Sequence, residues 1–291
     1  MLLPAHRSPL QKPLRGAGLL PIDPYLALYQ QAVVLYSLRK TTPQATRAIR
    51  IRRDIDSLEQ DIGFIGKDLD QQAIEDFATT GAISDCTIVK WYDQISNNDS
   101  IQNNGALQPK IYDVTTGEVT KETGKPAAIF DGAGDNVPII NVAGRSNIDA
   151  YLVNRHDDSS STSVNVNAYA YFTFFRTDLS SSLFGYVASL NSTGTFLHAS
   201  YGTPNLHKNN VLLSPTNRSE VYTFLGQTQN IVNHQGVDLS TWASCKFGSY
   251  ANSASFHFEG SLQEIIVFAD NLTTQERQLL HDDINNYYGI Y

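Results

Sequence analysis

The sequence feature that most limits the fold is a succession of short β-forming segments separated by turn residues. In the middle of the chain these segments fall at 109–114, 127–130, 168–175, 184–190, 195–199, 210–213, 221–225 and 256–258. Short strands that follow one another without helical crossovers are typical of sandwiches and barrels, not of alternating βαβ units. The sequence therefore predicts an all-β fold, an antiparallel β-sandwich.

The flanking segments add a few short helices to this sandwich. A short helix from residue 24 is expected to lead into a strand at 32–38, and residues 48–53 alternate apolar and cationic side chains, as in a half-exposed strand. A second short helix is expected at 68–79 behind a capping Asp, followed by a strand at 86–92. Near the C-terminus, a strand at 259–268 precedes an amphipathic helix at 273–287, in which Thr273 and Glu276 have the spacing of a capping box.

The chain is expected to consist of one domain, 23–291, behind an extended N-terminal arm, 1–22. The arm combines prolines, glycines and basic residues without apolar periodicity, so it is either an anchoring segment or a frayed terminus. Residues 155–163 contain no apolar anchor and are expected to form a mobile loop.

Composition and charge exclude several classes of partner. The 291 residues carry a net charge of −8, which argues against nucleic acid binding. No apolar run is long enough to span a membrane, and the N-terminus lacks the pattern of an export signal. Cys86 and Cys245 are expected to be buried free thiols or a single bridge, and no cysteine or histidine spacing indicates a metal site.

One stretch of sequence has the groups of a sugar-binding surface. Sugar rings pack against aromatic faces, while carboxylates and amides bind the hydroxyls. In the competing interpretation, Trp91 belongs to the core and Asp93 bonds backbone amides to hold the following turn. The glycan-binding candidates are Trp91, Tyr92, Asp93, Gln94 and Asn97, with Tyr201, Trp242, Tyr250 and His257 as secondary candidates for an aromatic rim.

Several motifs carry a family resemblance over residues 30–291. YSLR at 36–39, WYDQISNND at 91–99, QPKI at 108–111 and GKPAAIFDG at 124–132 resemble, in that order, the opening half of the catalytic domain of fungal α-L-arabinofuranosidase B. The same order is similar to a concanavalin A-like module found in bacteriophage virion proteins. FEGSLQEIIVF at 258–268, LTTQER at 272–277 and YYGIY at 287–291 look like the closing strand and helix of laminin G-like sandwiches. The resemblance implies a concanavalin A-like jelly roll.

The catalytic acids of the resembled glycosidase do not carry over. Its acid/base aspartate precedes the closing strand, where residues 247–255 of this chain contain no acid. Its nucleophile has its nearest counterpart in Glu220, without the expected context, so no catalytic residue is assigned and the chain is expected not to be an enzyme. A hydrolase would need Glu220 to meet Asp238 or Glu259. No cofactor is expected, although the acidic residues between 54 and 70 leave calcium open beside a solvated acidic surface.

These features lead to a first hypothesis and two alternatives. The first is a phage virion structural protein, a capsid decoration, fibre or tail component made in the host cytoplasm. Its arm would bind other virion proteins, its sandwich would face host glycans, and it would form a homo-oligomer. The alternatives are an arabinofuranosidase-like hydrolase and a free lectin-like carbohydrate-binding protein.

Overall fold

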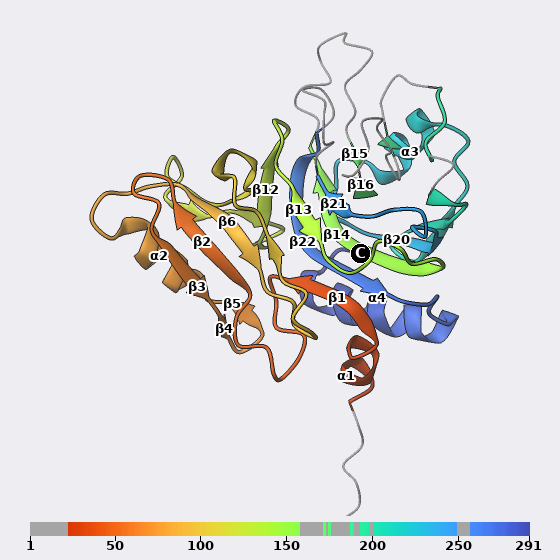
Figure 1. Ribbon diagram of the computed structural model, residues 1–291, viewed down its shortest axis with the longest axis horizontal. Coiled ribbons are helices and arrows are strands. Elements are labelled where there is room, and N and C mark those ends of the chain that lie inside the picture. Colours follow the sequence, from red (N-terminus) through yellow and green to blue (C-terminus); the bar gives the residue numbers. More distant parts are fainter. Residues whose placement is uncertain are drawn as a thin grey trace, which may run out of the picture.

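A computed structural model describes residues 23–157, 171–172, 174–175, 187–188, 193–197, 201–248 and 257–291. These residues build an antiparallel β-sandwich around one large, strongly bent sheet (Figure 1). Across the sheet lie, in order, β19 (Val211–Leu213), β18 (Asn205–Lys208), β20 (Asn230–Val237), β14 (Ile148–His156), β22 (Glu259–Phe268), β12 (Ala128–Asp131), β8 (Lys110–Asp113), β6 (Cys86–Trp91), β2 (Ile49–Arg53) and β3 (Glu59–Ile62). Three strands pair beside this path: β1 (Ala32–Ser37) with β22, β7 (Ser100–Ile101) with β6, and β9 (Glu118–Val119) with β8.

Smaller sheets and short helices accompany the large sheet. A separate three-stranded sheet contains β13 (Val137–Ile139), β21 (Cys245–Phe247) and β16 (Phe174–Phe175). Two-stranded pairs are β4 (Phe64–Ile65) with β5 (Asp68–Leu69), β10 (Lys121–Glu122) with β11 (Lys125–Pro126), and β15 (Tyr171–Phe172) with β17 (Val187–Ala188). The helices are α1 (Pro24–Tyr29), α2 (Gln71–Thr79), the 3-10 turn η1 (Gly105–Leu107), α3 (Arg218–Leu225) and α4 (Thr274–Tyr288).

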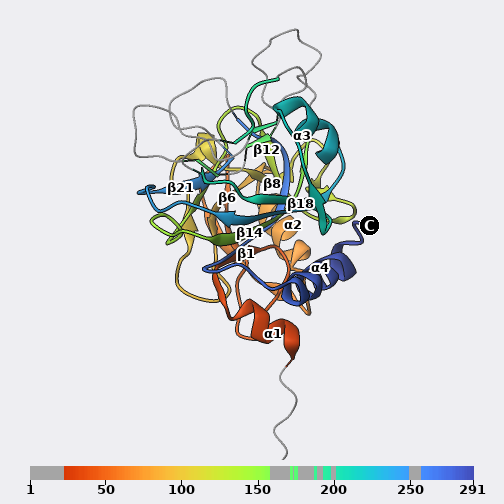
Figure 2. The same ribbon diagram turned by 90° about the vertical axis from the view of Figure 1, so that its right-hand side faces the viewer.

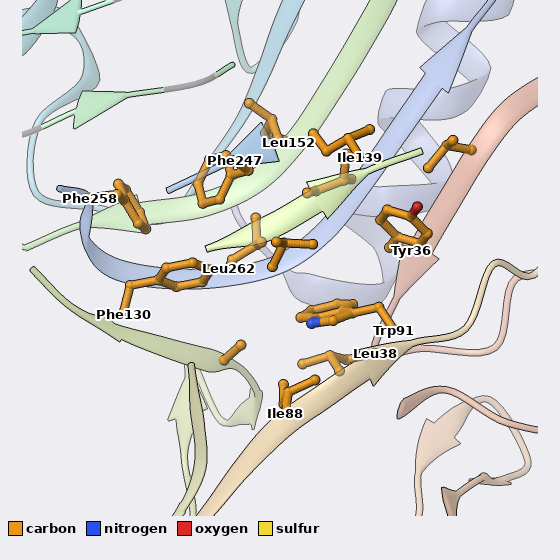
Figure 3. Close-up of a cluster of buried hydrophobic side chains, with 14 of the residues drawn as sticks. Tyr36, Leu38, Ile88, Trp91, Phe130, Ile139, Leu152, Phe247, Phe258 and Leu262 are labelled. Carbon is orange, nitrogen blue, oxygen red and sulfur yellow. The ribbon is translucent and has the colours of Figure 1, made fainter. Parts of the chain in front are cut away.

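The main core lies between β13 and β21 on one side and the bent sheet on the other (Figure 3). Phe130, Phe247 and Phe258 form a triangle of edge-to-face contacts with ring centroids 4.9–5.3 Å apart. Trp91 lies further along the same core, near Tyr36 (Figure 3). The two halves of the sheet therefore share one hydrophobic core.

The opposite face of the sheet packs against α1 and α4 (Figure 2). Side chains alternate along β14, so Leu152 enters the main core while Tyr151 and Val153 face Leu280 and its neighbours on α4. A buried ionic network ties these layers together. Its centre is Arg39, which donates to Glu264, to Asp283 (2.7 Å) and to the Tyr29 hydroxyl (2.6 Å).

The structure confirms the predicted antiparallel sandwich and several of its local elements. β1 follows a short helix as expected, and the Thr273–Glu276 capping box opens α4. The helix expected at 68–79 begins at Gln71, and its cap is Asp70. Both cysteines are buried free thiols.

Several secondary-structure predictions are wrong. Residues 221–225 belong to helix α3, because the Asn217 side chain accepts from the Glu220 backbone N–H at its start. In the described parts of two other predicted strands, residues 195–197 and 257–258, the structure has isolated β-bridge residues at Leu197 and His257 in place of a continuous strand. Arg155 and His156, expected in a mobile loop, end the central strand β14. The arm 1–22 and residues 158–163 lie outside the described residues.

No helix within the described ranges combines the length and the apolar character needed to cross a bilayer.

Candidate functional site

A polar pocket of about 250 Å³ lies at the end of β6, and we refer to it as the β6 pocket. Its lining residues include Thr46, Arg47, Tyr92, Ser96, Asn97 and Asp99. They come from the loop before β2 and from the turn after β6, which the β2–β6 pairing brings together. Four of the five leading candidates line this pocket: Tyr92, Asp93, Gln94 and Asn97.

Trp91 does not line the pocket, and its assignment as a glycan contact is wrong. Its side chain is only 2% exposed and packs in the main core near Leu38 and Ile88 (Figure 3). A ring buried on all sides cannot present a face to a sugar. The competing interpretation, in which Trp91 belongs to the core, is therefore the one that the structure supports.

Asp93 and Gln94 hold the local backbone in place. The Asp93 carboxylate accepts from the backbone N–H of Leu35 and of Ile95, each at 3.1 Å, and from the Ser96 hydroxyl. The Gln94 amide accepts from the Thr41 N–H at 2.9 Å and donates to the Arg39 carbonyl at 2.8 Å. These bonds fasten the turn after β6 to β1 and to the loop that follows it, so both side chains form the rigid floor of the pocket.

Tyr92 contributes a wall whose aromatic face is covered. Its hydroxyl donates to Asp61 at 2.6 Å, and the Arg47 guanidinium lies 4.1 Å from the ring centroid. Burial and the hydrogen bond to Asp61 raise the pKa of Tyr92 to about 12. Hydrogen bonds from Arg50, Tyr92 and Arg47 lower the pKa of Asp61 in spite of its partial burial. Tyr92 is therefore a neutral hydrogen-bonding wall rather than a stacking platform.

The groups open to a ligand are Arg47 and Asn97. The Arg47 side chain is 51% exposed, and Asn97 is exposed in the turn. Asp99 accepts from the Asp93 N–H at 3.1 Å and pairs with Lys90 at 3.4 Å. Guanidinium and amide donors therefore lie beside carboxylate and amide acceptors in one pocket. Arg47 and Thr46 were missed from sequence, because nothing in the order of residues relates that loop to the WYDQ turn.

The secondary candidates do not form an aromatic rim. Tyr201 and Trp242 are 0% and 2% exposed, and their ring centroids lie 6.0 Å apart within the core. The Tyr201 hydroxyl lies 3.1 Å from Nδ1 of His234. Their role as surface contacts is therefore wrong, because burial leaves neither ring accessible. His257 is half-buried, and Tyr250 lies outside the described residues.

The acids considered for a hydrolase serve local turns. Glu220 accepts from the Thr216 N–H at 2.7 Å and from the Asn217 side chain, which lowers its pKa. Asp238 accepts from the Ser240 N–H at 2.9 Å, and the hydrogen bonds from Ser240 lower its pKa also. Both carboxylates are therefore bonded within their own turns.

A different group of acids comes together at the end of β12, and we call it the acidic turn. It contains Asp131, Asp135 and Glu259, and Asp131 lies directly opposite Glu259 in the β12–β22 ladder. Directly opposed residues have Cβ atoms about 5 Å apart. Asp135 is 5% exposed and accepts from the Asp131 N–H at 3.0 Å. Burial, followed by the charge of Asp131, raises the pKa of Asp135 to about 7. In the sequence, this acidic turn corresponds to the DGAGD segment at 131–135, whose glycines allow the tight turn.

Four of the acidic residues between 54 and 70 are occupied by other partners. Asp61 pairs with Arg50 at 2.7 Å, Asp68 pairs with Lys125 at 2.9 Å, and Asp56 pairs with Arg53. Asp70 caps α2. In the described part of the chain, no three His, Cys, Asp or Glu side chains gather closely enough to hold a metal ion.

No protein-family model matches the sequence, and no curated protein matches it significantly. Three solved structures resemble the fold. One is a GH54 α-L-arabinofuranosidase soaked with a cyclic sulfate inhibitor (TM-score 0.44, 12% identity). Another is a mutant GH54 α-L-arabinofuranosidase soaked with 4-nitrophenyl α-L-arabinofuranoside (TM-score 0.42, 11% identity). A third is an arabinofuranosidase complexed with arabinofuranosyl-α-1,2-xylobiose (TM-score 0.43, 10% identity).

Each comparison covers 89% of this chain and 64% of the neighbour, so this chain spans less than two thirds of those enzymes. At these TM-scores the likeness carries no argument about activity.

Proposed function

We propose that this protein is a non-catalytic carbohydrate-binding β-sandwich whose sugar site is the β6 pocket. The observation that carries the proposal is the combination of exposed donors and acceptors, Arg47 and Asn97, over a floor fixed by Asp93 and Gln94. Sugar hydroxyls donate and accept at once, so they need both kinds of partner held in place. A pocket of about 250 Å³ suits a small ligand such as a single sugar residue.

Recognition in this pocket depends on hydrogen bonds rather than on stacking. The Tyr92 ring carries Arg47 at 4.1 Å and Lys90 at 5.0 Å from its centroid, so a sugar ring has no free aromatic face there. A guanidinium binds paired oxygens in a planar, two-pronged geometry. The ligand is therefore expected to present neighbouring hydroxyls or a carboxylate to Arg47.

A glycan array on the purified full-length chain tests this proposal. The wild type should retain a defined set of glycans, and Arg47→Ala and Asn97→Ala should each weaken retention at least tenfold. The matched control is Asn286→Ala, which removes an exposed amide from α4. Retention that is equally strong in all three variants would place the sugar elsewhere and refute the site. Failure of the wild type to retain any glycan would refute the function.

The proposal extends to display on a virion, with the arm 1–22 attached to other virion proteins and the domain forming a homo-oligomer. The support is the sequence resemblance to phage modules and the proline-rich, basic composition of the arm. Deletion of residues 1–22 separates this setting from a free lectin. A virion component loses assembly without its arm, whereas a free lectin keeps both glycan binding and its oligomeric state.

Glycoside hydrolysis at the acidic turn is a second candidate function. The specific observation is that Asp131 in β12 lies directly opposite Glu259 in the neighbouring strand β22, while burial raises the pKa of nearby Asp135 to about 7. Paired carboxylates about 5 Å apart serve retaining glycosidases, which also need a protonated acid near neutral pH. Hydrolysis of an aryl arabinofuranoside that Glu259→Gln abolishes and Glu220→Gln preserves would establish this function. Absence of turnover in the wild type would remove it.

A further inference from the structure

A second and larger pocket lies beside β21, and we call it the Lys246 pocket. Its volume is about 520 Å³, and it is lined from η1, β13, the loop after β13, and residues 243–246. Leu107, Pro138, Ile140 and Ala243 supply apolar walls. The β6 pocket and the Lys246 pocket share no lining residue.

The polar groups of one wall are already bonded to each other. Gln102 donates to the Asn136 side chain at 2.7 Å and accepts from the Asn104 N–H at 3.0 Å. Asn136 in turn donates to the Gly134 carbonyl at 3.0 Å. These amides are therefore fixed in position and need no bond from a ligand.

Lys246 is different, because its charge has no counterion in the described part of the chain. No ion pair or hydrogen bond to its side chain occurs among the described residues, although the residue is half-buried in β21. Burial lowers the pKa of Lys246 to about 8. Among the described lining residues, the other titratable one is Cys245, and none is a carboxylate. A partly desolvated ammonium group without an anion is costly, and an anionic ligand relieves that cost.

We propose that the Lys246 pocket binds a small organic carboxylate with an apolar body, its carboxylate on Lys246 and its body against Leu107, Pro138 and Ile140. The unpaired cation selects the charge of the ligand, and the apolar walls select its body. Polar sugars fit the β6 pocket better than this one. The inference therefore stands apart from the proposed carbohydrate function and survives if that function fails.

Calorimetric titration with 2-naphthoate, with neutral 2-naphthylmethanol as the comparison ligand, tests this site. The wild type should bind 2-naphthoate at pH 7 at least tenfold more tightly than Lys246→Met does, and Lys246→Arg should stay within about threefold of the wild type. Lys121→Met, which removes an exposed lysine from β10, is the matched control and should bind like the wild type.

A pH titration of the wild type provides a test that needs no variant. Between pH 7 and pH 9.5 Lys246 loses its proton, so 2-naphthoate affinity should fall at least tenfold while 2-naphthylmethanol affinity stays constant. Equal affinity of Lys246→Met and the wild type, a flat pH dependence, or no binding of 2-naphthoate at millimolar concentration would each overturn the proposal.

Discussion

Replacing Asp135 with Asn should stabilise the protein at alkaline pH and leave its stability unchanged in acid. Burial and the neighbouring Asp131 raise the pKa of Asp135 from 3.8 to about 7. Each pKa unit corresponds to ~1.4 kcal/mol, so ionisation of this carboxyl costs about 4 kcal/mol of folding free energy at pH 8. Because the folded-state pKa is raised, the cost is absent below pH 3.8 and grows until the pH passes about 7.

Asparagine preserves the local geometry that the protonated acid provides. Its side-chain oxygen can still accept from the Asp131 N–H, and its amide can donate toward the Asp131 carboxylate. Urea denaturation of both proteins at pH 4 and pH 8 measures the difference. We expect Asp135→Asn to match the wild type at pH 4 and to exceed it by about 2–4 kcal/mol at pH 8. A variant destabilised equally at both pH values would refute the reasoning. Asp131→Asn is the companion variant and should give a smaller gain of the same sign.

Three further predictions concern buried side chains. Trp91→Ala should lower the free energy of unfolding by about 3–5 kcal/mol in urea denaturation, because it empties a core position. A variant that is as stable as the wild type but has lost glycan binding would contradict the core role of Trp91. Arg39→Met should lower the free energy of unfolding by about 3–5 kcal/mol in the same measurement, since Glu264 and Asp283 are left as buried charges without their partner. An unchanged free energy of unfolding would contradict the stabilising role of this network. Burial lowers the pKa of His281 to about 4, so protonation of this side chain destabilises the folded wild type as the pH falls from 6.5 to 4. In urea denaturation over this pH range, His281→Leu should therefore lose about 3 kcal/mol less free energy of unfolding than the wild type. Parallel losses in the two proteins would contradict this prediction.

Strands β1, β6 and β22 and helix α4 could be predicted from local sequence, whereas β14 and β20 could not. β1, β6 and β22 are dense in β-branched and aromatic residues, and α4 carries a complete capping box, so local signals were enough. β14 and β20 escaped notice because they bury polar residues such as Asp149 and Asn233. Asn233 donates to Asp149 in the folded protein, a pairing between residues far apart in sequence that no local pattern shows.

The candidate site was only partly predictable for the same reason. The WYDQ turn was recognised, and Tyr92 and Asn97 line the β6 pocket, but strand alternation alone did not decide which side chains are open to solvent. Trp91 points into the core that β13 completes, and β13 lies well beyond it in sequence. Arg47 becomes part of the site only through the pairing of β2 with β6.

The most direct test of the central claim measures binding and turnover together. The full-length protein is incubated with a glycan that it retains on the array, and bound ligand and released sugar are both quantified by mass spectrometry. We predict saturable binding that Arg47→Ala weakens at least tenfold, with no released sugar. Release of sugar that Glu259→Gln abolishes would contradict the account and identify the protein as a hydrolase.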